Sequence, residues 1–189
     1  MTPGSKPQDK ERGVKTTTPK SVQDLPDAAL DLARRMFELA RSGDATLLEY
    51  MKSGLPPNLT NNRGDTLLML ATYHGHYELV KAMLRLPNPP DTNQLNSKGQ
   101  SVVAGAVFKG YKDLVRLLIE NGADPTAGQP SAEETAKMFN TWEDGEDGGE
   151  GYAKVFRDAK GRGVGASQAP EPVPDREQVR RVPGTGPSL

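Results

Sequence analysis

Apolar residues recur at helical spacing in three parts of the chain. Two segments share the order i, i+1, i+4, i+5, which places apolar side chains on one face of an α-helix. These residues are Leu79, Val80, Met83 and Leu84 in the first segment, and Leu114, Val115, Leu118 and Ile119 in the second. Residues 27–42 predict a longer helix with Leu30, Ala33, Phe37 and Ala40 facing inward. The pattern predicts an all-α fold.

Helix start and stop signals accompany these stripes. Thr66 and Ser101 are good N-caps, because a hydroxyl can accept a bond from a backbone N–H of the first turn. They predict short helices over 67–74 and 102–109. Gly75 and Gly110 follow, and glycine readily takes the left-handed conformation that ends a helix and turns the chain.

The same signals recur at a fixed interval. Residues 61–84 align with residues 96–119 at a constant offset of 35. A weaker upstream copy has its turn glycine, Gly43, 32 residues before Gly75. Such a period is typical of solenoid folds, in which each repeat packs on its neighbours.

These residues resemble the ankyrin repeat family. The match includes Gly64, Thr66, Leu68, Ala71, Gly75, His76, Val80 and Leu84, and later Gly99, Ala106, Gly110, Val115, Leu118, Gly122, Ala123 and Asp124. The resemblance implies a short solenoid of about three helix-turn-helix repeats. The family's Pro and His are absent from the segment that begins at Thr66, which implies a loss of hydrogen bonds between turns.

A final helix is predicted to close the stack. Ser131 and Glu134 fit a capping box, the former at the N-cap and the latter at N3. Ala132, Ala136 and Phe139 then share one face, which we expect to cover the open end of the repeats.

Composition changes at the edges of this unit. Residues 1–23 predict a disordered basic arm and residues 24–142 the ankyrin-like repeat domain. Residues 143–151 hold five acids and four glycines and predict a solvated acidic linker. Residues 152–189 are expected to be mostly a disordered tail, within which 152–160 favours a weak helix of about two turns. Thr18, which precedes a proline in the arm, leaves regulation by phosphorylation open.

Candidate chemistry is sparse. The sequence has no cysteine, which excludes a thiolate zinc site and a cysteine nucleophile. The two histidines, His74 and His76, are two residues apart and do not share a helix face. We therefore predict no catalytic residue, no metal site and no cofactor, and expect His76 to be a turn residue.

Charge and hydropathy limit the classes of partner that the chain is expected to bind. The formal net charge is −1, which argues against bulk binding of nucleic acid. No apolar run approaches the ~20 residues that span a bilayer, and residues 1–15 lack the apolar stretch of a secretory signal. We expect no membrane partner, a monomer on its own, and a cytoplasmic or nuclear location.

Repeat register predicts the interaction surface. In the ankyrin family the first helices and the turn tips line a concave groove. Corresponding positions place Tyr73 with Phe108, His74 with Lys109, and Arg63 with Lys98. These six residues are the candidate partner-binding site, with the two aromatics as anchors and the cations steering an acidic or mixed-charge partner. The alternative for Phe108 is burial in an irregular core.

The resemblance implies a non-catalytic protein–protein interaction module, an adaptor or scaffold that binds a protein of unknown identity in the groove. The alternative is a dedicated chaperone or regulatory subunit whose acidic segment shields a basic client. A complex held by charge alone should dissociate at moderate salt, whereas a groove-anchored complex should resist it.

Overall fold

The computed structural model describes residues 27–144 and 151–166. The predicted basic arm with Thr18, most of the acidic linker and the tail beyond residue 166 lie outside these residues, so their division stays a prediction. The described residues form eight α-helices and no strand, which confirms the all-α prediction. The helices are α1 (Asp27–Ser42), α2 (Thr46–Lys52), α3 (Leu67–Tyr73), α4 (Tyr77–Leu84), α5 (Val102–Phe108), α6 (Lys112–Glu120), α7 (Ala132–Met138) and α8 (Ala153–Arg157).

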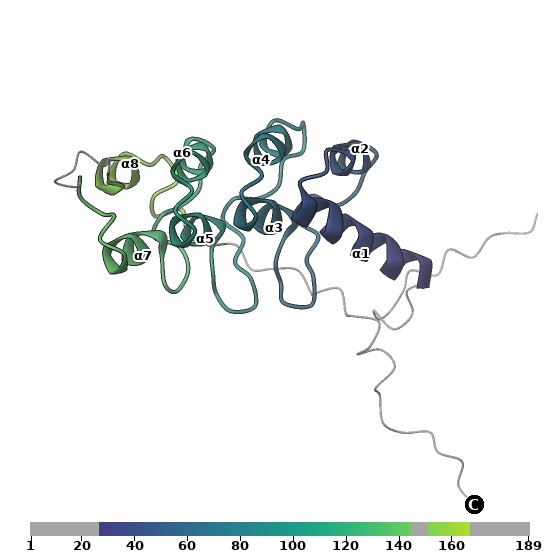
Figure 1. Cartoon of the computed structure of the whole chain (residues 1–189), viewed down its shortest axis with the longest axis horizontal. Coiled ribbons are helices and arrows are strands. Elements are labelled where there is room, and N and C mark those ends of the chain that lie inside the picture. Colours follow the sequence, from purple (N-terminus) through teal and green to yellow (C-terminus); the bar gives the residue numbers. More distant parts are fainter. Residues whose placement is uncertain (1–26, 145–150, 167–189) are drawn as a thin grey trace, which may run out of the picture.

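The helices stack in two rows. The inner row contains α1, α3, α5 and α7, each packed against the next, and the outer row contains α2, α4, α6 and α8. Long loops project from the inner row on the side away from the outer row (Figure 1). The short solenoid predicted from the repeat is therefore confirmed, and each helical pair rests on its neighbour.

The predicted caps and turns form the repeats. The Thr66 hydroxyl accepts from the Met69 N–H at 3.1 Å, and the Ser101 hydroxyl accepts from the Ala104 N–H at 3.2 Å. Gly75 and Gly110 have φ of +79° and +72°. Each inner helix therefore starts at a hydroxyl and ends at a left-handed turn that leads into its outer partner.

One core runs through the stack. The apolar stripes of the outer helices are buried, as are Leu30, Ala33, Phe37 and Ala40 of α1. These side chains join the apolar residues of α3 and α5 in a continuous cluster. Since no single helical pair covers its own apolar face, the repeats stabilise one another.

Asparagines connect the loops of successive repeats. The Asn58 side-chain oxygen accepts from the Asp91 N–H at 2.8 Å, and that of Asn93 accepts from the Asp124 N–H at 2.7 Å. These bonds join backbone more than 30 positions apart in the chain. They supply a connection between turns that the sequence comparison with the family did not anticipate.

The C-terminal end differs from the prediction. The capping box at Ser131 and Glu134 is present, and Ala132 and Ala136 are buried. The closing helix α7 is not alone, however, because α8 packs against α6 and buries Tyr152 and Phe156. The helical stack therefore extends past the predicted boundary at residue 142 and ends in a fourth helical pair.

The segment after α8 is also attached to the stack. Arg162 forms an ion pair with Glu133 of α7. The Gly165 N–H donates to the Asp124 carboxylate at 3.0 Å. Residues 158–166 therefore lie against the last two repeats instead of forming a free tail from residue 152 onward.

Candidate interaction groove

A groove follows the inner row and the loop tips, with a volume of about 570 Å³. The inner helices and their C-terminal ends contribute Arg41, Met69, Leu70, Tyr73, His74, Val102, Ala104, Gly105, Phe108, Thr135, Met138 and Phe139. The loops contribute Arg63, Asp65, Asn96, Lys98, Gln100, Ser101 and Pro130. The groove is therefore built from all four helical pairs.

Large apolar side chains are exposed in this groove. Tyr73 is 46% exposed and Phe108 is 57% exposed. Each is the last residue of its inner helix, so its side chain leaves the core where the chain turns toward the outer row. The alternative that Phe108 is buried in the core is wrong.

The same position of α7 carries a residue that sequence reasoning missed. Met138 lies seven residues after its N-cap, as Tyr73 and Phe108 do after theirs, and is 70% exposed in the groove. Counting from the caps would have identified it. Asn140 then takes the place of the turn glycine, with φ of +54°.

Phe139 was predicted to face inward with Ala132, and this is wrong. The helix ends at Met138, so Phe139 is the C-cap and its side chain leaves the helix on the groove side. It is 50% exposed, and its ring meets that of Phe108 edge to face at a centroid distance of 5.6 Å. The turn that follows α7 therefore adds an aromatic ring to the groove.

Cationic groups border these apolar side chains. The Lys109 ammonium lies 4.9 Å from the centre of the Tyr73 ring, a cation–π arrangement that keeps it beside the groove. At the loop tips, Arg63 and Lys98 are both exposed. The Arg63 guanidinium pairs with the Asp65 carboxylate at 2.8 Å.

His74 and His76 have different surroundings. Partial burial lowers the pKa of His74 below its usual value, and the nearby His76, Arg41 and Lys109 lower it further. The lowered pKa favours the neutral form of the His74 imidazole at pH 7. His76 Nε2 lies 2.6 Å from the Arg41 carbonyl oxygen, which connects the first two repeats and agrees with its expected turn role.

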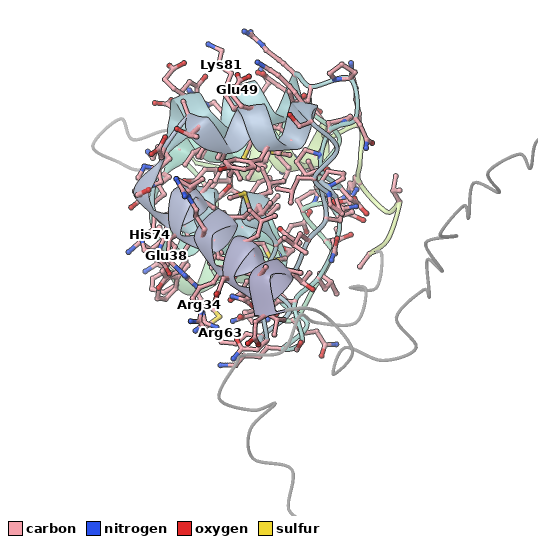
Figure 2. The ribbon with its side chains drawn as sticks, turned by 90° about the vertical axis from the view of Figure 1, so that its right-hand side faces the viewer. Arg34, Glu38, Glu49, Arg63, His74 and Lys81 are labelled. Atoms are coloured by element: carbon pink, nitrogen blue, oxygen red, sulfur yellow. The ribbon has the colours of Figure 1, made fainter. Side chains whose placement is uncertain are left out.

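The structure brings five of the six candidate residues into one groove, and the sixth, Lys109, lies beside it over Tyr73. Figure 2 shows the stack end-on, with Lys81 at the outer row at the top, His74 at the left and Arg63 at the bottom. The role of these residues in binding a partner stays a prediction.

No group of three or more His, Asp or Glu side chains is placed to hold a metal ion in residues 27–144 or 151–166. Over the same residues, no helix has the length and apolar character needed to cross a membrane.

The paired helices, the looped turns and the open groove define a helical-repeat protein. Residues 36–129 match the family model for ankyrin repeats, in three copies. The chain belongs to the ankyrin repeat family. Ankyrin repeats are generally protein–protein interaction modules, and the family fold is non-enzymatic.

The chain is also similar to an ankyrin repeat protein of Pseudomonas aeruginosa. The two are 46% identical over 66 residues, a stretch that covers 32% of this chain and 39% of the relative. The chain thus matches about two fifths of that protein's length, and the likeness is confined to a part of each.

Proposed function

We propose that this chain is a non-catalytic adaptor that binds a partner protein through the groove. The observation that supports this is that four large apolar side chains gather in a single groove, with exposed fractions between 46% and 70%. They are Tyr73, Phe108, Met138 and Phe139. Exposed apolar side chains that are contiguous and bordered by charge are typical of protein interaction sites.

Preorganisation supports the same proposal. Tyr73 and Phe108 end helices that are capped at their first residues and packed on a common core. Because the backbone that carries these rings is already ordered, little conformational entropy is lost when a partner binds. The aromatic rings would then act as anchors, and the cations around them would orient the partner.

The test is capture of partner proteins from a lysate of the source organism with the full chain as bait. A Tyr73→Ala/Phe108→Ala variant should lose the partner, because truncation of interface anchors costs about 2 kcal/mol or more each, a factor of about 30 in affinity. A Leu32→Ala/Val164→Ala variant is the matched control, since both side chains are exposed and neither lines the groove. Circular dichroism should show that all three baits are folded.

Equal recovery of a partner by the native chain and the anchor variant would contradict the groove assignment. Release of the partner at moderate salt, together with indifference to the anchor variant, would favour the acidic-shield alternative. The sequence-based expectations of a monomer and of a cytoplasmic or nuclear location stay predictions.

A further inference from the structure

We infer that the occupant of the groove is a short acidic segment of a partner protein that carries apolar anchor side chains. This inference rests on the proposed function and adds the chemistry of the partner. It follows from the distribution of charge around the groove, from the apolar groups at its floor, and from what already covers the aromatic rings.

Cations border the groove on both sides. Arg63 and Lys98 occupy equivalent loop tips, and Arg41 and Lys109 lie at the ends of inner helices. Arg41 and Arg63 are already paired with Glu38 and Asp65, so Lys98 and Lys109 carry the positive charge that these pairs do not balance. A carboxylate that enters the groove can meet either ammonium. Charge-assisted hydrogen bonds of this type are shorter and stronger than neutral ones.

The groove offers little negative charge in return. Asp65 is the one carboxylate among the described residues that line it. Its two oxygens already accept from the Arg63 guanidinium at 2.8 Å, from the Asn61 amide at 3.1 Å and from the Asn96 amide at 2.9 Å. Asp65 is also buried, so it cannot serve a basic peptide. Beside Arg41, the carboxylate of Glu38 is engaged by that arginine.

The floor requires apolar side chains from the occupant. Four exposed apolar residues line the groove, and burying such groups is worth about 25 cal/mol per Å². Neighbouring helices pack about 8–10 Å apart, so four inner helices cover roughly 25–30 Å, which about eight or nine extended residues span. A segment of this length can place carboxylates at the borders and apolar anchors on the floor.

A single-stranded nucleic acid fits less well. It would need free aromatic faces on which bases stack. One face of Tyr73 is covered by the Lys109 ammonium, and Phe108 packs edge to face with Phe139. These contacts leave less open ring face for a base to stack on, whereas apolar peptide side chains can pack against the exposed parts of the rings. The anionic partner that suits the groove is therefore a peptide.

The experiment is selection of a random library of about 12-residue peptides, a length that exceeds the span of the groove, on the immobilised full chain. Enriched peptides should carry several Asp or Glu residues together with Leu, Phe or other apolar residues. Their affinities are then measured by fluorescence anisotropy against the native chain and three variants, with an oligothymidylate as a competitor.

The charge variant is Lys98→Glu/Lys109→Glu, which should weaken binding at least tenfold, on the order of the effect of rim charges on association. Its matched control is Lys81→Glu/Arg85→Glu, at a residue of α4 and at the C-cap that follows this helix. It makes the same change in net charge at residues that do not line the groove, and it should change affinity less than about twofold. The third variant, Tyr73→Ala/Phe108→Ala, should abolish binding.

The outcomes separate this inference from the proposed function. Enriched peptides that need the aromatic anchors but are neutral or basic would overturn the inference of an acidic partner. So would peptides that bind the charge variant as tightly as the native chain. Either result would leave the groove as a binding site. Peptides indifferent to the aromatic variant would overturn both. The acidic-peptide assignment would also be overturned if no peptide is enriched. The same holds if the oligothymidylate displaces enriched peptides at a lower concentration than unlabelled peptide does.

Discussion

Short polar side chains and turn glycines position the groove residues. Thr66 and Ser101 begin the inner helices, and the left-handed turns at Gly75 and Gly110 end them. Each signal acts within a few residues, because it satisfies a backbone N–H or permits one backbone angle. This is why Tyr73 and Phe108 were identified from sequence as equivalent positions, and why the structure exposes both.

Gly43 and Gly110 form a matched pair for testing the turns. Both are left-handed, with φ of +74° and +72°. A Cβ at Gly43 would lie 2.4 Å from Nδ1 of His76, whereas a Cβ at Gly110 would meet nothing within 4 Å. Gly110→Ala should cost about 1–2 kcal/mol for the left-handed backbone alone. Gly43→Ala should cost more, because moving the His76 ring breaks its bond to the Arg41 carbonyl.

Guanidinium denaturation measures both costs. In a Gly43→Ala/His76→Ala chain the two changes should couple, since removal of the ring removes the clash. Equal destabilisation by Gly43→Ala and Gly110→Ala would show that the His76 ring moves aside without a loss in the free energy of unfolding.

The elements differ in how much of their formation is local. Helix α1 has 16 residues and a continuous inward face, and its predicted bounds are confirmed. Helix α8 has five residues, fewer than an isolated helix needs. Its stability comes from contacts with α6 and from the stacking of Tyr152 on Phe156 at 5.3 Å. The sequence accordingly predicts only a weak helix there, within the tail.

Phe156→Ala tests whether α8 is part of the stack. Phe156 is fully buried, so the substitution should reduce the free energy of unfolding by about 3–5 kcal/mol. Val164→Ala is the control, because Val164 is 71% exposed and should change stability by less than about 0.5 kcal/mol. Chemical denaturation gives both values, and a loss below about 1 kcal/mol at Phe156 would mean that α8 contributes little.

The molecule as a whole is a short array with a continuous core. That core includes residues of α1 at one end and Phe156 of α8 at the other. Nearest-neighbour coupling in so short an array favours unfolding in one step. A rigid stack also keeps the groove, which draws on all four helical pairs, in one shape.

The single tryptophan tests this cooperativity. Trp142 follows α7 and lies 6.1 Å from Phe156 between ring centres, so its fluorescence reports the C-terminal pair. Circular dichroism at 222 nm reports all helices. The two guanidinium transitions should share one midpoint in the native chain. A fluorescence transition at lower denaturant would show that the C-terminal pair unfolds before the repeats.

The sequence was sufficient to predict the repeats, their caps and their turns, because hydroxyl caps, left-handed glycines and apolar stripes act over a few neighbouring residues. It also aligned Tyr73 with Phe108. Tertiary contacts determine that Phe139 turns to the groove, that α8 completes a fourth pair, and that Asp65 is engaged by residues of two repeats. These outcomes depend on contacts between segments far apart in the chain, and no local pattern specifies such contacts.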